Sequence, residues 1–339
     1  MKAVLALMIG LLISERLLAD SFSSGSTQFA IDFSTIGDPG NPGDPASPLG
    51  LGAVADTFRM STYAVNLDAV SKANTAGSLG ITTYSYAGAG ITGGDLPGRP
   101  ATGLSWNEAA RFVNWLNSVS GHPLAYKFTT QPGDMGYNPN ENISLWDPMD
   151  PGYNASNLYR NSLAVYYLPS EIEWYKSAYY SGASNVYYDY ASQQDSPAVP
   201  TPVGSGTAAG TLVYNQPFLN GPAEVDDAGA PSHYGLIGQT GNAFEWMESA
   251  FTGTNDSPTE TRVLRGGSWQ FNKDFLPAVG TFSRGGDAPS DGELTYGFRV
   301  ASVIPEPSAI TLVTLAVSIL GAHFIPRNRG RPNTSQLIA

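Results

Sequence analysis

The chain of 339 residues carries 29 acidic and 17 basic side chains, a formal net charge of −12, and it contains no cysteine. The lack of cysteine excludes thiolate nucleophiles, thiolate metal sites and disulfides. The negative charge argues against binding to nucleic acid or anionic lipid, because phosphates would be repelled, and it favours cations such as calcium.

The composition predicts a loop-rich body with aromatic packing. Hydrophobic residues make up 42% of the chain, enough for a sizeable core, whereas charged residues make up only 14%. The 38 glycines, 25 prolines and 18 tyrosines favour turns and aromatic contacts. No Gly/Ser linker divides the body, so we expect one domain.

The N-terminal segment has the pattern of a secretory signal peptide. Lys2 precedes an apolar run from Val4 to Ile13, and the small residue Ala19 follows. We assign residues 1–19 to this signal and leave them out of the fold prediction. Because Glu15 and Arg16 interrupt the end of the run, an uncleaved anchor is the alternative.

The first predicted elements of the body are strands. Residues 29–33 alternate apolar and polar side chains, and residues 57–65 also have strand character. Gly, Pro, Asn and Asp are dense between residues 37 and 48, which predicts a loop. Residues 77–102 carry no clear pattern.

Two capping boxes predict two helices. Ser105 with Glu108 begins the first helix, which ends before Gly121. Ser170 with Glu173 begins the second, which ends before Gly182. The core candidates of these helices are Ala109, Phe112, Val113 and Leu116, followed by Ile172, Trp174, Tyr175 and Ala178. Irregular segments are predicted at 131–153 and 187–232.

The C-terminal segment has three parts in a fixed order. Pro305-Glu306-Pro307 precedes an uncharged stretch from Ser308 to Ile325, and arginines follow at positions 327, 329 and 331. The stretch is just long enough to cross a bilayer. This order resembles the PEP-CTERM sorting signal of Gram-negative bacteria over residues 305–331. The resemblance implies transient membrane insertion through 308–325 and removal by an exosortase-type enzyme, with a permanent single-pass anchor as the alternative.

Six motifs follow one another along the body: LSWNEAA (104–110), YLPSEIEW (167–174), YGL (234–236), GNAFEW (241–246), RVLRGGSW (262–269) and GFRV (297–300). In this order they resemble the sulfatase-modifying factor domain, the family of the formylglycine-generating enzyme, over residues 29–302. The resemblance implies an α+β, C-type-lectin-like fold, low in regular secondary structure, with two main helices and short antiparallel strands.

The family reaction is a copper-dependent oxidation of a substrate cysteine that uses two enzyme cysteines. The resemblance places those positions at Phe271 and Leu276. Thiolates hold Cu(I), and neither hydrocarbon side chain can replace them. Copper is therefore not expected, and we assign no catalytic residue. Met247, His122 and His233 are too dispersed to form a substitute ligand set.

The family's calcium site is a further expectation from the resemblance. It falls on the backbone carbonyls of Gly238, Gly241 and Ala243 and on the carboxylate of Glu245. Oxygen donors of this type suit a hard divalent cation. The alternative is that Glu245 only forms hydrogen bonds within the protein.

Other polar residues have both a structural and a functional interpretation. Arg265, Arg284 and Arg299 stand at family positions, where we favour pairing with carboxylates or loop carbonyls over ligand binding. Five tryptophans are predicted as core or loop anchors, namely Trp106, Trp115, Trp174, Trp246 and Trp269. The acids Asp226, Asp227, Asp287, Asp291 and Glu293 are interpreted as solvated loop residues, with a glycosidase carboxylate pair as the minor alternative.

Together these features predict an exported, non-catalytic domain that binds a peptide, glycan or extracellular polymer. Its location would be the cell surface or the extracellular medium of a Gram-negative bacterium, after passage through the inner membrane. One alternative is an oxidoreductase of the formylglycine-generating type, or a divergent metal-dependent relative. Another is a structural protein of the exopolysaccharide matrix.

Overall fold

The computed structural model describes residues 18–196, 198–280 and 283–304. Residues 1–17 of the predicted signal peptide and the predicted tail at 305–331 lie outside these ranges. The described residues up to Ile304 form one compact unit. Within the described ranges, every helix is too short or too polar to cross a bilayer.

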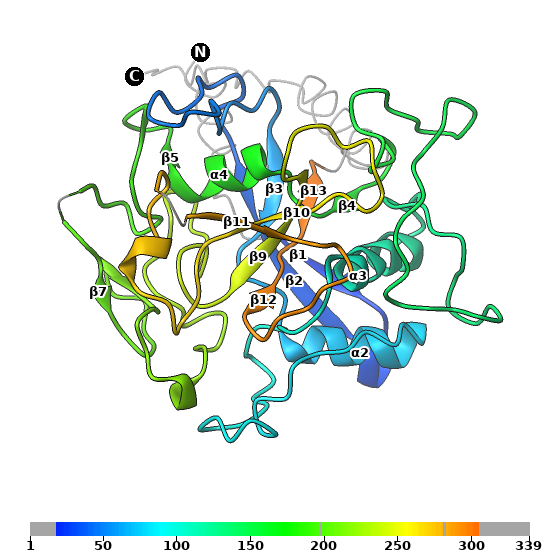
Figure 1. Ribbon diagram of the computed structural model, residues 1–339, viewed down its shortest axis with the longest axis horizontal. Coiled ribbons are helices and arrows are strands. Elements are labelled where there is room, and N and C mark those ends of the chain that lie inside the picture. The colour runs from blue at the N-terminus through cyan, green and yellow to red at the C-terminus, as the bar shows by residue number, and fades with distance from the viewer. Residues whose placement is uncertain (1–17, 197, 281–282, 305–339) are drawn as a thin grey trace, which may run out of the picture. The chain divides into compact units, whose positions relative to one another are not determined.

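The strands are short and long loops connect them, as the composition predicted (Figure 1). Strand β1 begins at Leu18, so the body includes residues before the predicted start at Phe29. The strands are β1 (Leu18–Phe22), β2 (Phe29–Ile36), β3 (Phe58–Ser61), β4 (Tyr166–Tyr167), β5 (Tyr180–Ser181), β6 (Val186–Tyr187), β7 (Thr201–Pro202), β8 (Thr211–Leu212), β9 (Phe244–Ala250), β10 (Arg262–Arg265), β11 (Arg284–Asp287), β12 (Tyr296–Gly297) and β13 (Ala301–Val303).

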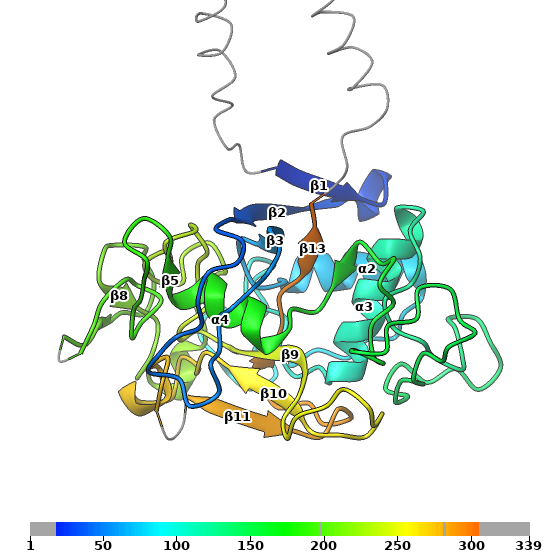
Figure 2. The same cartoon turned by 90° about the horizontal axis from the view of Figure 1, so that it is seen from above.

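Two sheets form the framework of the body. The larger has the strand order β1-β2-β3-β13-β4, and the smaller has the order β11-β10-β9-β12. Figure 2 shows them as upper and lower layers, and α4 (Glu171–Tyr179), which lies between them in this view, contacts β9. Most strand pairs are antiparallel as predicted, but β9 with β12 and β7 with β8 are parallel.

The two predicted helices are confirmed, and both capping boxes form. In α3 (Trp106–Val119) the Ser105 hydroxyl accepts from the Glu108 amide, while the Glu108 carboxylate accepts from the Ser105 amide. Ser170 and Glu173 repeat this arrangement at the start of α4. Short 3₁₀ turns also occur at η1 (Gly25–Thr27), η2 (Phe218–Asn220) and η3 (Lys273–Phe275).

A third helix, α2 (Leu67–Gly77), was not predicted. Asn66 caps it by accepting a hydrogen bond from the Ala69 amide, and Val70 and Ala73 are buried on its inner face. The helix packs against α3 and β2. The predicted strand at 57–65 is therefore shorter than expected, because it ends at Ser61 and the chain then turns into α2.

The core is aromatic, and the five predicted tryptophan anchors lie in it. Trp106, Trp115, Trp174, Trp246 and Trp269 are all buried. Trp106 and Trp246 each donate an indole hydrogen bond to a backbone carbonyl, so their polar atoms are satisfied inside the core. Ile172 was wrongly predicted as a core residue, because α4 presents it to solvent with 41% of its surface exposed.

Candidate functional site

A groove of about 470 Å³ opens along the smaller sheet. Phe244 of β9, Leu264 of β10, the whole of β11 and Tyr296 of β12 contribute to its wall. The loop after β10 closes another side. The remaining lining residues are Gln270, Phe271, Phe275, Glu293, Leu294 and Thr295.

Two glycines after β10 bring the loop back over the sheet. Gly266 has a φ of 104°, and a Cβ there would lie 2.6 Å from the carbonyl oxygen of Gln239. Such a contact is impossible, so the turn requires glycine. The backbone amide of Trp269 then donates a hydrogen bond to the Asn242 carbonyl, which anchors the loop. Phe271 comes to lie at the groove.

The structure gives Phe271 and Leu276 different roles. Phe271 packs edge-on against Phe244, with ring centroids 5.5 Å apart, and lines the groove. Leu276 is fully buried. It belongs to a small cluster with Tyr190, Leu212 and Tyr214. One of the two positions therefore faces the groove, and the other serves the core.

Glu171 pairs with two of the predicted arginines. Its carboxylate accepts hydrogen bonds from Arg265 at 2.6 and 2.8 Å, and from Arg284 at 2.8 and 2.9 Å. Glu171 and Arg265 are buried, whereas Arg284 is partly exposed and lines the groove. This cluster ties the start of α4 to β10 and β11.

Glu245 and Arg299 form a second buried pair. Both side chains are fully buried, and the guanidinium donates to the two carboxylate oxygens at 2.6 and 2.7 Å. The Trp174 indole also donates to Glu245, while Arg299 bonds three backbone carbonyls. All three arginines thus pair with a carboxylate, and of the three only Arg284 lines the groove.

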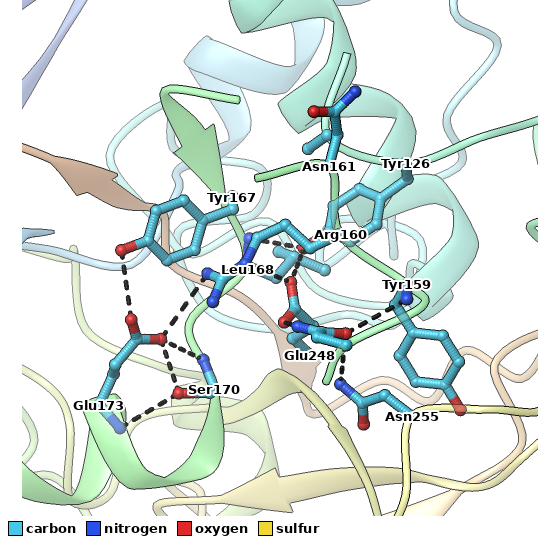
Figure 3. Close-up of polar contacts among 12 residues, drawn as sticks. Tyr126, Tyr159, Arg160, Asn161, Tyr167, Leu168, Ser170, Glu173, Glu248 and Asn255 are labelled. Carbon is cyan, nitrogen blue, oxygen red and sulfur yellow. Dashed lines mark hydrogen bonds and ion pairs between the residues drawn. The ribbon is translucent and has the colours of Figure 1, made fainter. Parts of the chain in front are cut away.

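A third polar network surrounds Glu248 of β9 (Figure 3). Tyr126 and Asn157 donate hydrogen bonds to its carboxylate, and Arg160 lies between Glu248 and Glu173. Burial raises the pKa of Glu248, and the Arg160 charge opposes that shift. Because Glu248 is fully buried, we interpret this network as structural.

The five predicted loop acids fall into separate places. Asp287 and Glu293 line the groove, Asp226 and Asp227 line a different cavity, and Asp291 is exposed. The prediction of a loop was wrong for Asp287, which is the last residue of β11. Sequence reasoning missed three aromatic groove residues, Phe244, Phe275 and Tyr296. Phe244 lies inside the GNAFEW motif and Tyr296 directly precedes GFRV, so their motif positions were the available indication.

Residues 53–304 match the family described as "Sulfatase-modifying factor enzyme 1-like domain". The chain belongs to this family. A search of curated proteins finds no significant match. Among solved structures, Treponema denticola variable protein 1 is similar with a TM-score of 0.55 at 20% identity, covering 85% of this chain and 99% of its own. CarF is similar with a TM-score of 0.53 at 17% identity, covering 81% and 99%.

At such low identity, the solved structures support the fold alone. Together with the family match they confirm the predicted α+β sulfatase-modifying-factor fold, with short strands in curled sheets. The correction concerns the number of helices, which is three within the described residues.

This sulfatase-modifying-factor domain offers copper no thiolate donors. The phenyl ring of Phe271 and the isobutyl group of Leu276 have no lone pairs to share, and the chain has no cysteine elsewhere. Across the described residues, no three His, Cys, Asp or Glu side chains converge as a metal site. The residues present therefore do not fit the family's copper.

The calcium expectation meets a competing interaction at Glu245. The carboxylate is already neutralised by Arg299 inside the core, so a calcium ion would face a guanidinium at hydrogen-bond distance from its only anionic ligand. Gly238, Gly241 and Ala243, whose carbonyls complete the expected ligand set, lie in the turn before β9. With Glu245 engaged in this way, the donor set does not fit a calcium ion that is held through this carboxylate.

Chelation tests the calcium assignment. We expect EDTA to leave the melting temperature of the purified protein unchanged, because Arg299 already supplies the positive charge that Glu245 needs. Differential scanning fluorimetry with and without EDTA, followed by added calcium, measures the effect. A drop reversed by calcium but not by magnesium would restore the assignment, since a ligand of the native state stabilises it.

Proposed function

We propose that this sulfatase-modifying-factor domain is an exported, non-catalytic module that binds an extracellular ligand in the groove. The observation that carries the proposal is that Phe271, at a position where the resemblance places a catalytic cysteine, lines an open groove. The groove offers rings and a few polar groups, which are features of binding sites. It offers no thiolate for oxidation.

Export is part of the proposal and rests on the sequence patterns at the two ends. The signal-like segment at 1–19 would direct the chain through the inner membrane, and the PEP-CTERM-like segment at 305–331 would be processed by an exosortase-type enzyme. The natural ligand would then be a peptide, glycan or polymer outside the cell. Nucleic acid is not expected, because the chain is strongly acidic.

Blocking the groove tests the binding role. Phe271→Arg should reduce retention of the protein on cell-surface and extracellular fractions of the producing bacterium at least about tenfold, because a charged side chain would occupy the apolar part of the groove. Phe218→Arg is the matched control, since Phe218 is exposed on η2 and does not line the groove. Retention is measured by pull-down, and circular dichroism checks that both variants fold.

Two outcomes would contradict the proposal. Equal retention of the two variants would place the ligand outside the groove. Conversion of a cysteine peptide to formylglycine by the purified protein with Cu(I) and oxygen, detected by mass spectrometry, would show that another ligand set supports the family reaction. We expect the peptide to keep its thiol.

A further inference from the structure

We propose that the groove holds a quaternary ammonium group, of the kind found in choline. The inference rests on the proposed function, because it assigns a ligand chemistry to the same groove. Four aromatic side chains and two carboxylates carry it. The rings belong to Phe244, Phe271, Phe275 and Tyr296, and the carboxylates to Asp287 and Glu293.

The other three rings stand at steep angles to the ring of Phe244. Its ring plane makes an angle of 71° with Phe271, 81° with Phe275 and 88° with Tyr296, at centroid distances between 5.5 and 6.3 Å. Phe271 and Phe275 are themselves only 4.6 Å apart. Because these four rings face different directions, we call them the box. A flat sugar ring would need one continuous platform, so the box is better suited to a compact cation.

The charges around the rings favour a cation. Asp287 and Glu293 line the groove, and Glu293 makes no side-chain hydrogen bond or ion pair with the residues that the structure describes. Burial first, and then the carboxylates of Asp287, Glu293 and Asp291, raise the pKa of Tyr296. The phenol therefore lies in a negative field, and an aromatic face in such a field attracts cations.

Arg284 is the one cationic side chain among the lining residues, and its guanidinium is bound to two residues outside the lining, Glu171 and Phe251. Its guanidinium is fixed on Glu171 through two nitrogens and lies over the Phe251 ring, with the central carbon 4.2 Å from the centroid. Counted in full, its charge still leaves the lining negative, because Asp287 and Glu293 are both acidic.

Of the four rings only Tyr296 carries a polar atom, and these ring faces select the kind of cation. A primary ammonium has three N–H donors and is strongly hydrated, so burial among phenyl rings would leave donors unsatisfied. A quaternary ammonium has no donors and presents only polarised methyl groups to the ring faces. The lining thus favours a trimethylammonium group over a lysine side chain.

Titration with matched small molecules tests the inference on the purified protein. Choline should bind at least about tenfold more tightly than dimethylbutanol, its neutral isostere in which carbon replaces nitrogen. It should also bind more tightly than Nα-acetyl-lysine amide, which carries the free ammonium group of a lysine side chain. Isothermal titration calorimetry measures the three affinities. Phosphatidylcholine vesicles identify the source, since co-sedimentation indicates a lipid headgroup and choline binding without it indicates a soluble ligand.

Substitutions of groove residues test whether choline binds in the box. Phe271→Leu keeps an apolar side chain but removes the ring, and should weaken choline binding about tenfold. Glu293→Gln should weaken it several-fold and reduce its dependence on salt. Glu224→Gln, a change to an exposed acid outside the groove, should have no effect.

The inference is overturned if choline and its neutral isostere bind equally, if the lysine derivative binds more tightly, or if folded Phe271→Leu binds choline like the wild type. The absence of choline binding also overturns it. In that case, loss of retention in Phe271→Arg would show that the groove still binds a ligand of another class. Normal retention of Phe271→Arg would instead mean that the proposed function has failed.

Discussion

Glu171→Gln is expected to destabilise the protein by about 3–5 kcal/mol, since removal of one partner from a buried ion pair leaves an uncompensated charge. The carboxylate serves two guanidiniums, and Arg265 is almost fully buried. Glutamine would supply one carbonyl oxygen for these donors and add donors of its own. Urea denaturation, monitored by circular dichroism, measures the decrease in the free energy of unfolding.

Asp68→Asn is the matched control for this change. Asp68 pairs with Lys72 one turn along α2, and both side chains are substantially exposed. A pair of this type contributes roughly 0.3–0.5 kcal/mol. Similar losses in the two variants would show that the Glu171 cluster contributes no more than a surface pair.

Lys176→Met is expected to stabilise the protein by roughly 1–3 kcal/mol at pH 7, because it removes a charge that folding buries. Lys176 is fully buried on α4, and its ammonium donates a hydrogen bond of 2.8 Å to the Asp38 carbonyl. Burial lowers the pKa of Lys176 from 10.5 to about 8, and the Asp38 charge only partly opposes the shift. Methionine fills a similar volume without the charge.

The gain from Lys176→Met should shrink as the pH rises above 8. Between pH 8 and 10.5 the unfolded chain binds a proton on Lys176 that the folded chain has released, so the stability of the wild type rises with pH. Urea denaturation of both proteins at pH 7 and pH 9.5 gives the difference between their free energies of unfolding at each pH. Because both proteins contain the same tyrosines, the titration of the tyrosines cancels in this difference.

Lys72→Met, on the exposed face of α2, is the control for the lysine prediction. Its effect should be small and the same at both pH values. A constant gain from Lys176→Met, or a loss at pH 7, would mean that the buried amine is better satisfied than the single hydrogen bond to Asp38 suggests.

The helices illustrate which parts of the fold were readable in the sequence. Both predicted helices have a Ser and a Glu three residues later, a signal contained in four neighbouring residues. Helix α2 was missed because Asn66 is followed at that position by Ala69, which cannot complete a capping box, and because Ser78 ends the helix where glycine would be typical. Contacts with α3 and β2 supply the rest of its stability.

The groove illustrates what the sequence did not contain. The motif order led to Phe271, and the rarity of basic residues led to paired arginines. Which carboxylates they pair with was not readable, because Glu171 lies 94 residues from Arg265 and 113 from Arg284. The box around Phe244 likewise joins β9, β12 and the loop after β10.

By itself, the sequence determined the absence of thiolate chemistry, the two capped helices and the family, because these depend on residue identity and short spacings. Only the tertiary structure decided that Leu276 is a core residue, that Glu245 is engaged by Arg299, and that four rings and two acids share one groove. These are contacts between distant segments, and they exist only once the chain is packed in three dimensions.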